Sequence, residues 1–240
     1  GYSQNDVREL ARVLTGWTID PKSSNGFQFV PRLHEAGQKS VMGQTFPKNP
    51  MSAGEAEGIQ AIRYLANHPA TALRVSRRLA EYFVADNPSD VLVEGMAKTF
   101  IATGGDIAEV MKTLLTSADF WSPNNTLYKT PFEYACTSLR VMNAGLDRTK
   151  WLQAFGYTAA AGQGIQNWLT PDGYAFSANT WLTPEALTRR IDFALTTSRN
   201  VADRTDLYAY LSDTTQQAVK KQSPSQRLGF VLGSSELVFK

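Results

Sequence analysis

Helix-start signals recur along this chain and constrain its fold more than any other feature. Ser3 and Ser52 are each followed three residues later by a carboxylate, Asp6 and Glu55, which is the spacing of a capping box. Proline at the first helical position marks further starts at His68-Pro69, Thr130-Pro131 and Thr183-Pro184. Apolar residues at helical spacing follow these signals. The sequence therefore predicts an all-α fold: a multi-helix array with at most a small β-hairpin.

Short connections join the central helices, so neighbours in sequence should pack antiparallel. The helix that Ser52 opens has Ile59, Ile62 and Leu65 as its apolar stripe. In the next helix Leu79 and Phe83 lie one turn apart. Both stripes are predicted to face the core.

Two irregular excursions interrupt the helices of a predicted single helical domain, 1–240. Segment 18–50 is rich in Gly, Pro, Ser and Asn, with alternating Phe27 and Phe29, and is predicted to be a long ordered loop with a short hairpin. Loops of this length in compact domains are usually functional or disordered. Segment 145–182, rich in glycine and aromatics, is predicted to be irregular too.

Composition excludes several classes of function. With 240 residues the chain can bury roughly 70–75% of its unfolded surface, so it needs no metal or disulfide to fold. The net charge is only +2 and no basic cluster exists, so we expect no nucleic-acid partner. The single cysteine, Cys136, forbids an intrachain disulfide and a thiolate metal site, and it is predicted to be a buried, inert thiol.

No apolar run reaches the roughly 18–20 residues that span a bilayer, and no signal peptide is present. Because the chain starts at Gly1, it is expected to be a trimmed or processed piece of a longer protein.

A glycine-rich phosphate loop, a His-Glu-x-x-His pair and a Gly-x-Ser-x-Gly elbow are all absent from the sequence. We therefore expect no cofactor, no metal and no nucleophilic hydrolysis, and no catalytic residue can be named.

The densest group of versatile polar residues lies in the first excursion. His34 and Glu35 are adjacent, and Lys39 follows after Gly37. Trp17 precedes them in sequence and is predicted to form a wall of the site. Histidine is well suited to proton transfer near neutral pH, so these residues are the primary ligand-binding candidates. The alternative is that His34 and Glu35 stabilise a long loop through backbone hydrogen bonds.

Three residues are secondary candidates. His68 precedes Pro69 and is predicted to cap the following helix, with metal ligation as the alternative. Arg77 belongs to a charged helix face that is either solvated or a clamp for an anionic glycan or phosphate. Trp181 belongs to a set of aromatic residues that forms either a sugar-binding groove or a second core, with Trp17, Trp168 and Tyr174 as its other members.

Several segments, in order over nearly the whole chain, carry a family resemblance. They are Leu10-Ala11-Arg12 with Leu14-Thr15-Gly16-Trp17, His34-Glu35-Ala36-Gly37-Gln38-Lys39, His68-Pro69-Ala70-Thr71-Ala72, Lys129-Thr130-Pro131-Phe132-Glu133, Pro171-Asp172-Gly173-Tyr174 and Trp181-Leu182-Thr183-Pro184. In these the chain resembles the C-terminal part of the domain-of-unknown-function 1800 family. The family's upstream Trp-His-Asn-His and Asn-Glu-Asn-Phe-Ala-Arg-Glu segments are not in this sequence.

The resemblance implies an exported bacterial protein, periplasmic or secreted, that works together with its own upstream region. The first functional hypothesis is a non-enzymatic helical module in envelope-associated assembly or ligand binding, with a glycan or an envelope protein as partner. The alternative is a hydrolase-like enzyme whose site is shared with the upstream half.

Overall fold

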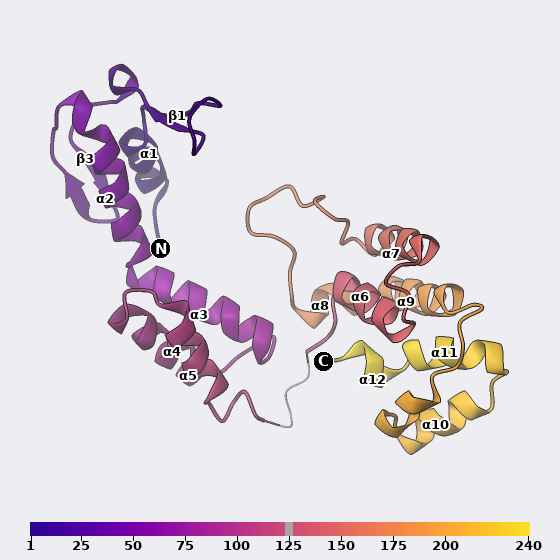
Figure 1. Ribbon diagram of the computed structural model, residues 1–240. Helices are drawn as coiled ribbons and strands as arrows, with labels where there is room; N and C mark the ends of the chain where they lie inside the picture. Colours follow the sequence, from indigo (N-terminus) through magenta and orange to yellow (C-terminus); the bar gives the residue numbers. More distant parts are fainter. Residues whose placement is uncertain (123–126) are drawn as a thin grey trace. The chain divides into compact units, whose positions relative to one another are not determined.

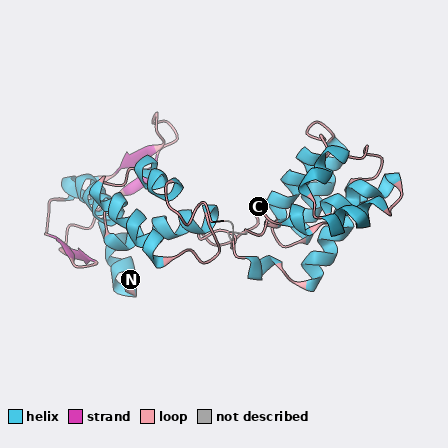
Figure 2. Ribbon diagram, turned by 90° about the horizontal axis from the view of Figure 1, so that it is seen from below, coloured by secondary structure: helices cyan, strands magenta, loops and turns pink. Residues whose placement is uncertain are grey.

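A computed structural model describes residues 1–122 and 127–240 (Figure 1). The described residues are mostly helical, and their strands form two small antiparallel hairpins (Figure 2), which confirms the predicted all-α class. Contacts divide the chain into two compact units. Unit 1 comprises Gly1–Ala80 and Ser89–Ser117, and unit 2 comprises Glu81–Pro88 and Ala118–Lys240. The single domain over 1–240 stays a prediction.

Unit 1 combines helices with both hairpins. Within the first excursion, β1 pairs with β2 and β3 with β4, so 18–50 contains two hairpins where one was predicted. The elements are α1 (Gln4–Val13), β1 (Trp17–Ile19), β2 (Phe27–Phe29), η1 (Pro31–Leu33), β3 (Lys39–Val41), β4 (Gln44–Phe46), η2 (Met51–Ala53), α2 (Gly54–Ala66), α3 (Pro69–Phe83), α4 (Asp90–Ala102) and α5 (Ile107–Leu115).

The first two helix starts have different outcomes. At α1 the predicted capping box is present, since the Ser3 hydroxyl accepts the Asp6 N–H at 3.2 Å and Asp6 accepts the Ser3 N–H at 2.7 Å. The predicted box at Ser52 was wrong. Ser52 lies inside the 3₁₀ turn η2, which runs directly into α2 at Gly54, and no side chain caps that helix. Because its backbone is already helical, Ser52 does not adopt the extended conformation of an N-cap.

The predicted apolar stripes of α2 and α3 were wrong for most of their residues, although Leu65 packs against a core as predicted. In α2, Ile59 and Ile62 are exposed, and the buried face consists of Gly54, Glu57, Gly58 and Ala61. In α3, Phe83 is 41% exposed and Leu79 is half-buried, whereas the buried seam is Ala72, Ser76 and Ala80. Apart from Glu57, the residues in these buried positions are small, which lets each helix approach its neighbours closely, and bulkier residues lie at the flanks.

The pair α4 and α5 follows the sequence prediction. Ser89 caps α4 and Asp106 caps α5, and the two helices pack side by side (Figure 1). Met96 and Leu114, both fully buried, lie between them with other apolar side chains. This packing forms one core of unit 1, and a second forms from Val13, Val41, Phe46 and Ala61.

The described residues of unit 2 form helices and one isolated antiparallel bridge, between Tyr128 and Phe239. Helix α7 packs against α6 and α9, and α11 packs against α9 and α10, around a core that includes Tyr134, Phe193 and Leu232. The elements are α6 (Pro131–Val141), α7 (Arg148–Ala160), α8 (Ala178–Trp181), α9 (Pro184–Thr197), η3 (Thr205–Tyr210), α10 (Asp213–Lys220), α11 (Pro224–Leu232) and α12 (Ser235–Val238). No helix in the described ranges combines the length and the apolar character that crossing a membrane requires.

The predicted irregular segment 145–182 was wrong over α7. Asp147 caps that helix by accepting the N–H groups of Thr149 and Lys150 at 2.9 and 3.1 Å. The apolar residues of α7 are spread around the helix: Ala154 and Tyr157 are buried, whereas Trp151, Leu152 and Phe155 remain partly exposed. A helix without a single apolar stripe gives no clear periodic signal.

A buried cation holds part of unit 2 together. The guanidinium carbon of Arg190, a residue only 2% exposed, lies 4.4 Å from the ring centroids of both Tyr128 and Tyr134. Its Nη2 donates to the Lys129 carbonyl at 2.8 Å. Burial raises the pKa of Tyr134, so its hydroxyl stays neutral and donates to the Leu232 carbonyl at 2.8 Å. Arg190 therefore links α9 to α6 through the Tyr134 ring and to the segment before α6 through Tyr128 and the Lys129 carbonyl.

Met96→Ala should lower the free energy of unfolding by about 2–5 kcal/mol, because it removes a fully buried side chain. Ile62→Ala removes a side chain from an exposed position and should lose much less. Urea titrations of both variants measure the difference. Equal losses would contradict the burial pattern described for α2 and α4.

Asp6→Asn tests the cap of α1 through its pH dependence. Hydrogen bonds from the Ser3 hydroxyl and N–H lower the pKa of Asp6 from 3.8 to about 2. Since the folded-state pKa is depressed, the stability that Asp6 contributes is present above pH 3.8 and is lost as pH falls through about 2. The stability difference between wild type and Asp6→Asn, from urea titrations, should therefore shrink over that range. A stability difference that does not change with pH would show that the Asp6 charge does not stabilise the fold.

Candidate functional site

The polar group predicted in the first excursion is buried in packed protein. His34 follows η1 and Lys39 begins β3, and they are only 3% and 1% exposed. Glu57, 3% exposed on α2, completes the group, which we call the buried polar cluster: His34, Lys39 and Glu57. The sequence analysis missed Glu57.

Lys39 makes three polar contacts inside this cluster. Its Nζ hydrogen-bonds His34 Nε2 at 3.2 Å and the Glu35 carbonyl oxygen, and it forms an ion pair with Glu57 Oε1 at 2.8 Å. Neither oxygen of the Glu57 carboxylate accepts a hydrogen bond within the described residues, so the ion pair is its main compensation. Lys39 is therefore a structural cation in this arrangement.

The partners of His34 fix its tautomer. Its Nδ1 lies 2.8 Å from the Thr15 carbonyl oxygen, which can only accept a hydrogen bond, so Nδ1 carries the proton. Its Nε2 then accepts from Lys39. The Thr15 hydroxyl donates to the Arg12 carbonyl at 2.6 Å and accepts the Glu35 N–H at 2.9 Å. Both ring nitrogens are engaged, and the loop is tied to the end of α1.

Two glycines of α2 make room for the rings of the first excursion. A Cβ at Gly54 would lie 2.4 Å from Cγ of His34, and one at Gly58 would lie 2.4 Å from Cζ2 of Trp17. Both rings therefore rest directly on the helix backbone. Glycine inside a helix lowers stability by roughly 0.5–1 kcal/mol relative to alanine. The close approach of the two rings explains why glycine nevertheless occupies positions 54 and 58. Gly54 and Gly58, on either side of Glu57, are the sequence signal that could have revealed the cluster.

Glu35 points away from its predicted partners. It is exposed, and its Oε1 accepts from Nε and Nη2 of Arg12 at 2.9 and 2.6 Å. These hydrogen bonds lower the pKa of the Glu35 carboxyl group. The structure thus brings His34 and Lys39 together. The ring of Trp17, a residue of β1, rests nearby against α2, whereas the Glu35 side chain forms a surface ion pair.

This geometry favours the loop-stabilising alternative. Neither His34 nor Lys39 has a free proton or lone pair, and Trp17 packs edge-on against Phe27, with ring centroids 5.1 Å apart. Binding of a ligand by His34, Glu35, Lys39 and Trp17 stays a prediction.

The secondary candidates of α3 have structural partners. His68 Nδ1 accepts the Ala70 N–H at 3.1 Å, so His68 caps α3 as predicted. Arg77 Nη2 donates to Asp90 Oδ1 at 2.7 Å, and both side chains are exposed. Across residues 1–122 and 127–240, no three His, Cys, Asp or Glu side chains come close enough to share a metal ion.

In unit 2 two of the predicted aromatic residues, Trp168 and Tyr174, line an open pocket of about 420 Å³, which we call the aromatic pocket. The rings of Trp168 and Tyr174 lie 4.8 Å apart, tilted by 50°. Trp181, 5% exposed, packs 6.2 Å from Tyr174, whereas Trp17 belongs to unit 1. The lining residues are Ala159, Gly162, Gly164, Asn167, Trp168, Leu169, Thr170 and Tyr174.

Hydrogen bonds fix the orientation of these rings. Trp168 Nε1 donates to Asp172 Oδ1 at 2.9 Å, and the Thr170 hydroxyl donates to the same oxygen. The Tyr174 hydroxyl donates to the Gly164 carbonyl at 2.7 Å. Each ring is thus held by its polar end, and Trp168 keeps 46% of its surface exposed. The pocket is preorganised for a ligand that stacks on aromatic faces.

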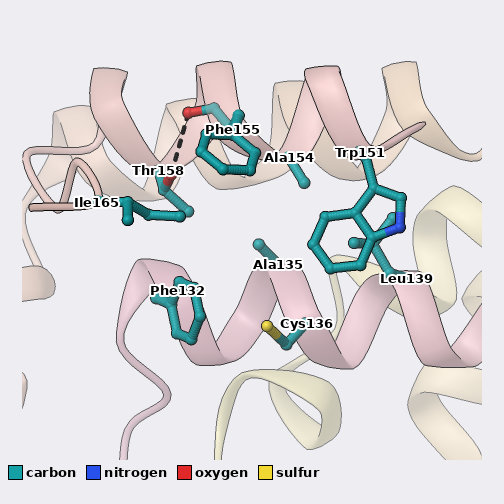
Figure 3. Close-up of a pocket in the computed structure, with 9 residues that line it drawn as sticks. All are labelled: Phe132, Ala135, Cys136, Leu139, Trp151, Ala154, Phe155, Thr158 and Ile165. Carbon is teal, nitrogen blue, oxygen red and sulfur yellow. Dashed lines mark hydrogen bonds between the residues drawn. The ribbon is translucent and has the colours of Figure 1, made fainter. Parts of the chain in front are cut away.

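A second concavity of unit 2 lies between α6 and α7 (Figure 3). Phe132, Cys136, Trp151 and Phe155 line it, but its volume of about 20 Å³ is room for about one water molecule. Cys136 is half-buried where full burial was predicted, and burial raises the pKa of its thiol. A raised pKa keeps the thiol protonated, in agreement with the inert cysteine expected from the sequence.

Lys39→Met should lower the free energy of unfolding by about 3–5 kcal/mol, because it leaves the buried Glu57 carboxylate without its cation. The double variant Lys39→Met/Glu57→Met removes both charges and should be more stable than the single variant. Chemical denaturation of wild type and both variants measures this. A single variant as stable as the wild type would show that the pair is not desolvated.

Comparison with known proteins gives one match. No curated protein and no solved structure is similar to this chain. The sequence profile of the family described as "Protein of unknown function (DUF1800)" matches residues 1–235, nearly the whole chain. The chain therefore belongs to the domain-of-unknown-function 1800 family.

Proposed function

We propose that this chain is a non-enzymatic binding module of an exported bacterial protein, and that it binds a glycan of the cell envelope through the aromatic pocket. A periplasmic or secreted location follows from the family resemblance alone. The upstream region of the same protein and an envelope protein are the other proposed partners. The observation that carries the proposal is the fixed, half-exposed ring of Trp168 beside Tyr174.

The chemistry of the aromatic pocket suits a sugar. The C–H face of a sugar ring is apolar and flat enough to stack on an indole or phenol ring, whereas its hydroxyl groups need hydrogen-bond partners. Asn167 lines the pocket with a side-chain amide that makes no hydrogen bond within the described ranges, and Asp172 lies behind Trp168. An apolar platform with a few polar groups is typical of small-molecule sites, and 420 Å³ is within their range of size.

Binding is favoured over hydrolysis by the same geometry. Glycoside hydrolysis uses two carboxyl groups on either side of the scissile bond. Among the described residues that line the aromatic pocket, none is Asp or Glu. In unit 1 the donors of His34 and Lys39 are engaged within the buried polar cluster, which favours a structural role there.

Trp168→Ala should weaken glycan binding about tenfold or more, because it removes the exposed stacking face. The probes are soluble peptidoglycan fragments and chito-oligosaccharides, titrated calorimetrically. Trp121→Ala is the matched control, since Trp121 is 74% exposed and does not line the pocket. Absence of binding by the wild type, or an equal loss in both variants, would overturn the proposal.

A further inference from the structure

Helices α2 and α3 meet end to end in unit 1 (Figure 1). A polar pocket of about 490 Å³ lies at this junction, and none of the roles described so far accounts for it. Its walls come from β4, from the last turns of α2 and from the start of α3. Most of its lining residues are polar and none is acidic: Gln44, Gln60, Arg63, Tyr64, Asn67, His68 and Pro69. We call it the junction pocket.

The lining of the junction pocket carries a positive charge. Arg63 is the one fixed charge among the described residues that line it, and none of them is Asp or Glu. Arg63 lines the pocket, is exposed, and forms no ion pair with any carboxylate in the described part of the chain. This contrasts with Arg12 and Arg77, whose carboxylate partners are 2.6 and 2.7 Å away.

His68 supplies a donor of defined direction. Because its Nδ1 accepts the Ala70 N–H, the proton of the neutral ring is on Nε2, which is free to donate. The Tyr64 ring packs edge-on against His68, with centroids 5.8 Å apart, and the Tyr64 hydroxyl donates to the Met42 carbonyl at 2.8 Å. The hydrogen bond to the Ala70 N–H and the packing against the Tyr64 ring therefore both fix the orientation of the His68 ring.

We infer that the junction pocket binds the carboxylate group of a small hydrophilic molecule, with Arg63 as its charge partner and His68 Nε2–H as a further donor. One guanidinium beside a neutral imidazole matches a monoanion, and the planar guanidinium fork matches the two oxygens of a carboxylate. The side-chain amide of Gln60 and the amide oxygen of Asn67, whose Nδ2 donates to the Arg63 carbonyl at 2.9 Å, suit hydroxyl or amide groups on the rest of the ligand. This inference is independent of glycan binding at the aromatic pocket.

The test is a titration of the 240-residue chain with gluconate, followed by amide chemical shifts in two-dimensional NMR spectra. Glucose serves as the neutral counterpart and inorganic phosphate as the other oxyanion. Gluconate should shift amide signals around Arg63 and His68, glucose should shift none, and Arg63→Gln should weaken the binding about tenfold or more. His68→Asn keeps a helix-capping acceptor but removes the Nε2–H donor, so it should weaken binding while α3 stays folded.

Arg77→Gln is the matched control, because it removes the same charge from an arginine of unit 1 outside the junction pocket. It should bind gluconate as the wild type does. Three results would overturn the inference: no shifts at the pocket in the wild type, an equal loss in Arg77→Gln, which would indicate nonspecific attraction, or stronger binding of phosphate than of gluconate.

Discussion

The contact between Lys39 and Glu57 is the interaction on which the irregular part of unit 1 depends. Each charge loses several kcal/mol of hydration when it is buried, so the pair is stable only if its mutual attraction and further polar contacts offset that loss. Lys39 contributes contacts to a carboxylate, an imidazole nitrogen and a carbonyl oxygen, whereas neither Glu57 oxygen accepts a hydrogen bond within the described residues. A charge placed so deeply fixes the position of β3 against α2.

The same contact explains why segment 18–50 is ordered although it is long and rich in turn-forming residues. Its two hairpins are short and could not be stable alone. They are held at one end by apolar packing of Val41 and Phe46 and at the other by His34 and Lys39. The aromatic pocket of unit 2 follows a similar rule, because hydrogen bonds to the polar ends of Trp168 and Tyr174 hold a glycine-rich loop. In both units, polar anchors take the place of regular secondary structure.

Local features of this fold could be predicted from the sequence, and features that depend on distant partners could not. The caps at Ser3 and Thr130 involve residues three positions apart, so the sequence alone defines them. The buried face of α2 could not be predicted in this way, since it is selected by rings from the first excursion. A buried glutamate is rare without a partner, and the partner of Glu57 is eighteen residues away in sequence. Trp168, Tyr174 and Trp181 are close in sequence and lie together as predicted, whereas Trp17, also grouped with them, lies in unit 1.

The close approach of Trp17 to Gly58, and of His34 to Gly54, has a consequence for how this chain can vary. In each pair one residue has no side chain because the other fills the space, so the two positions share one volume. A larger residue at position 58 is compatible with the fold only if position 17 becomes smaller in the same chain. Positions 54 and 34 are linked in the same way. These two pairs should therefore change together among family members, and a pair that varies independently would mark a member whose first excursion is folded differently.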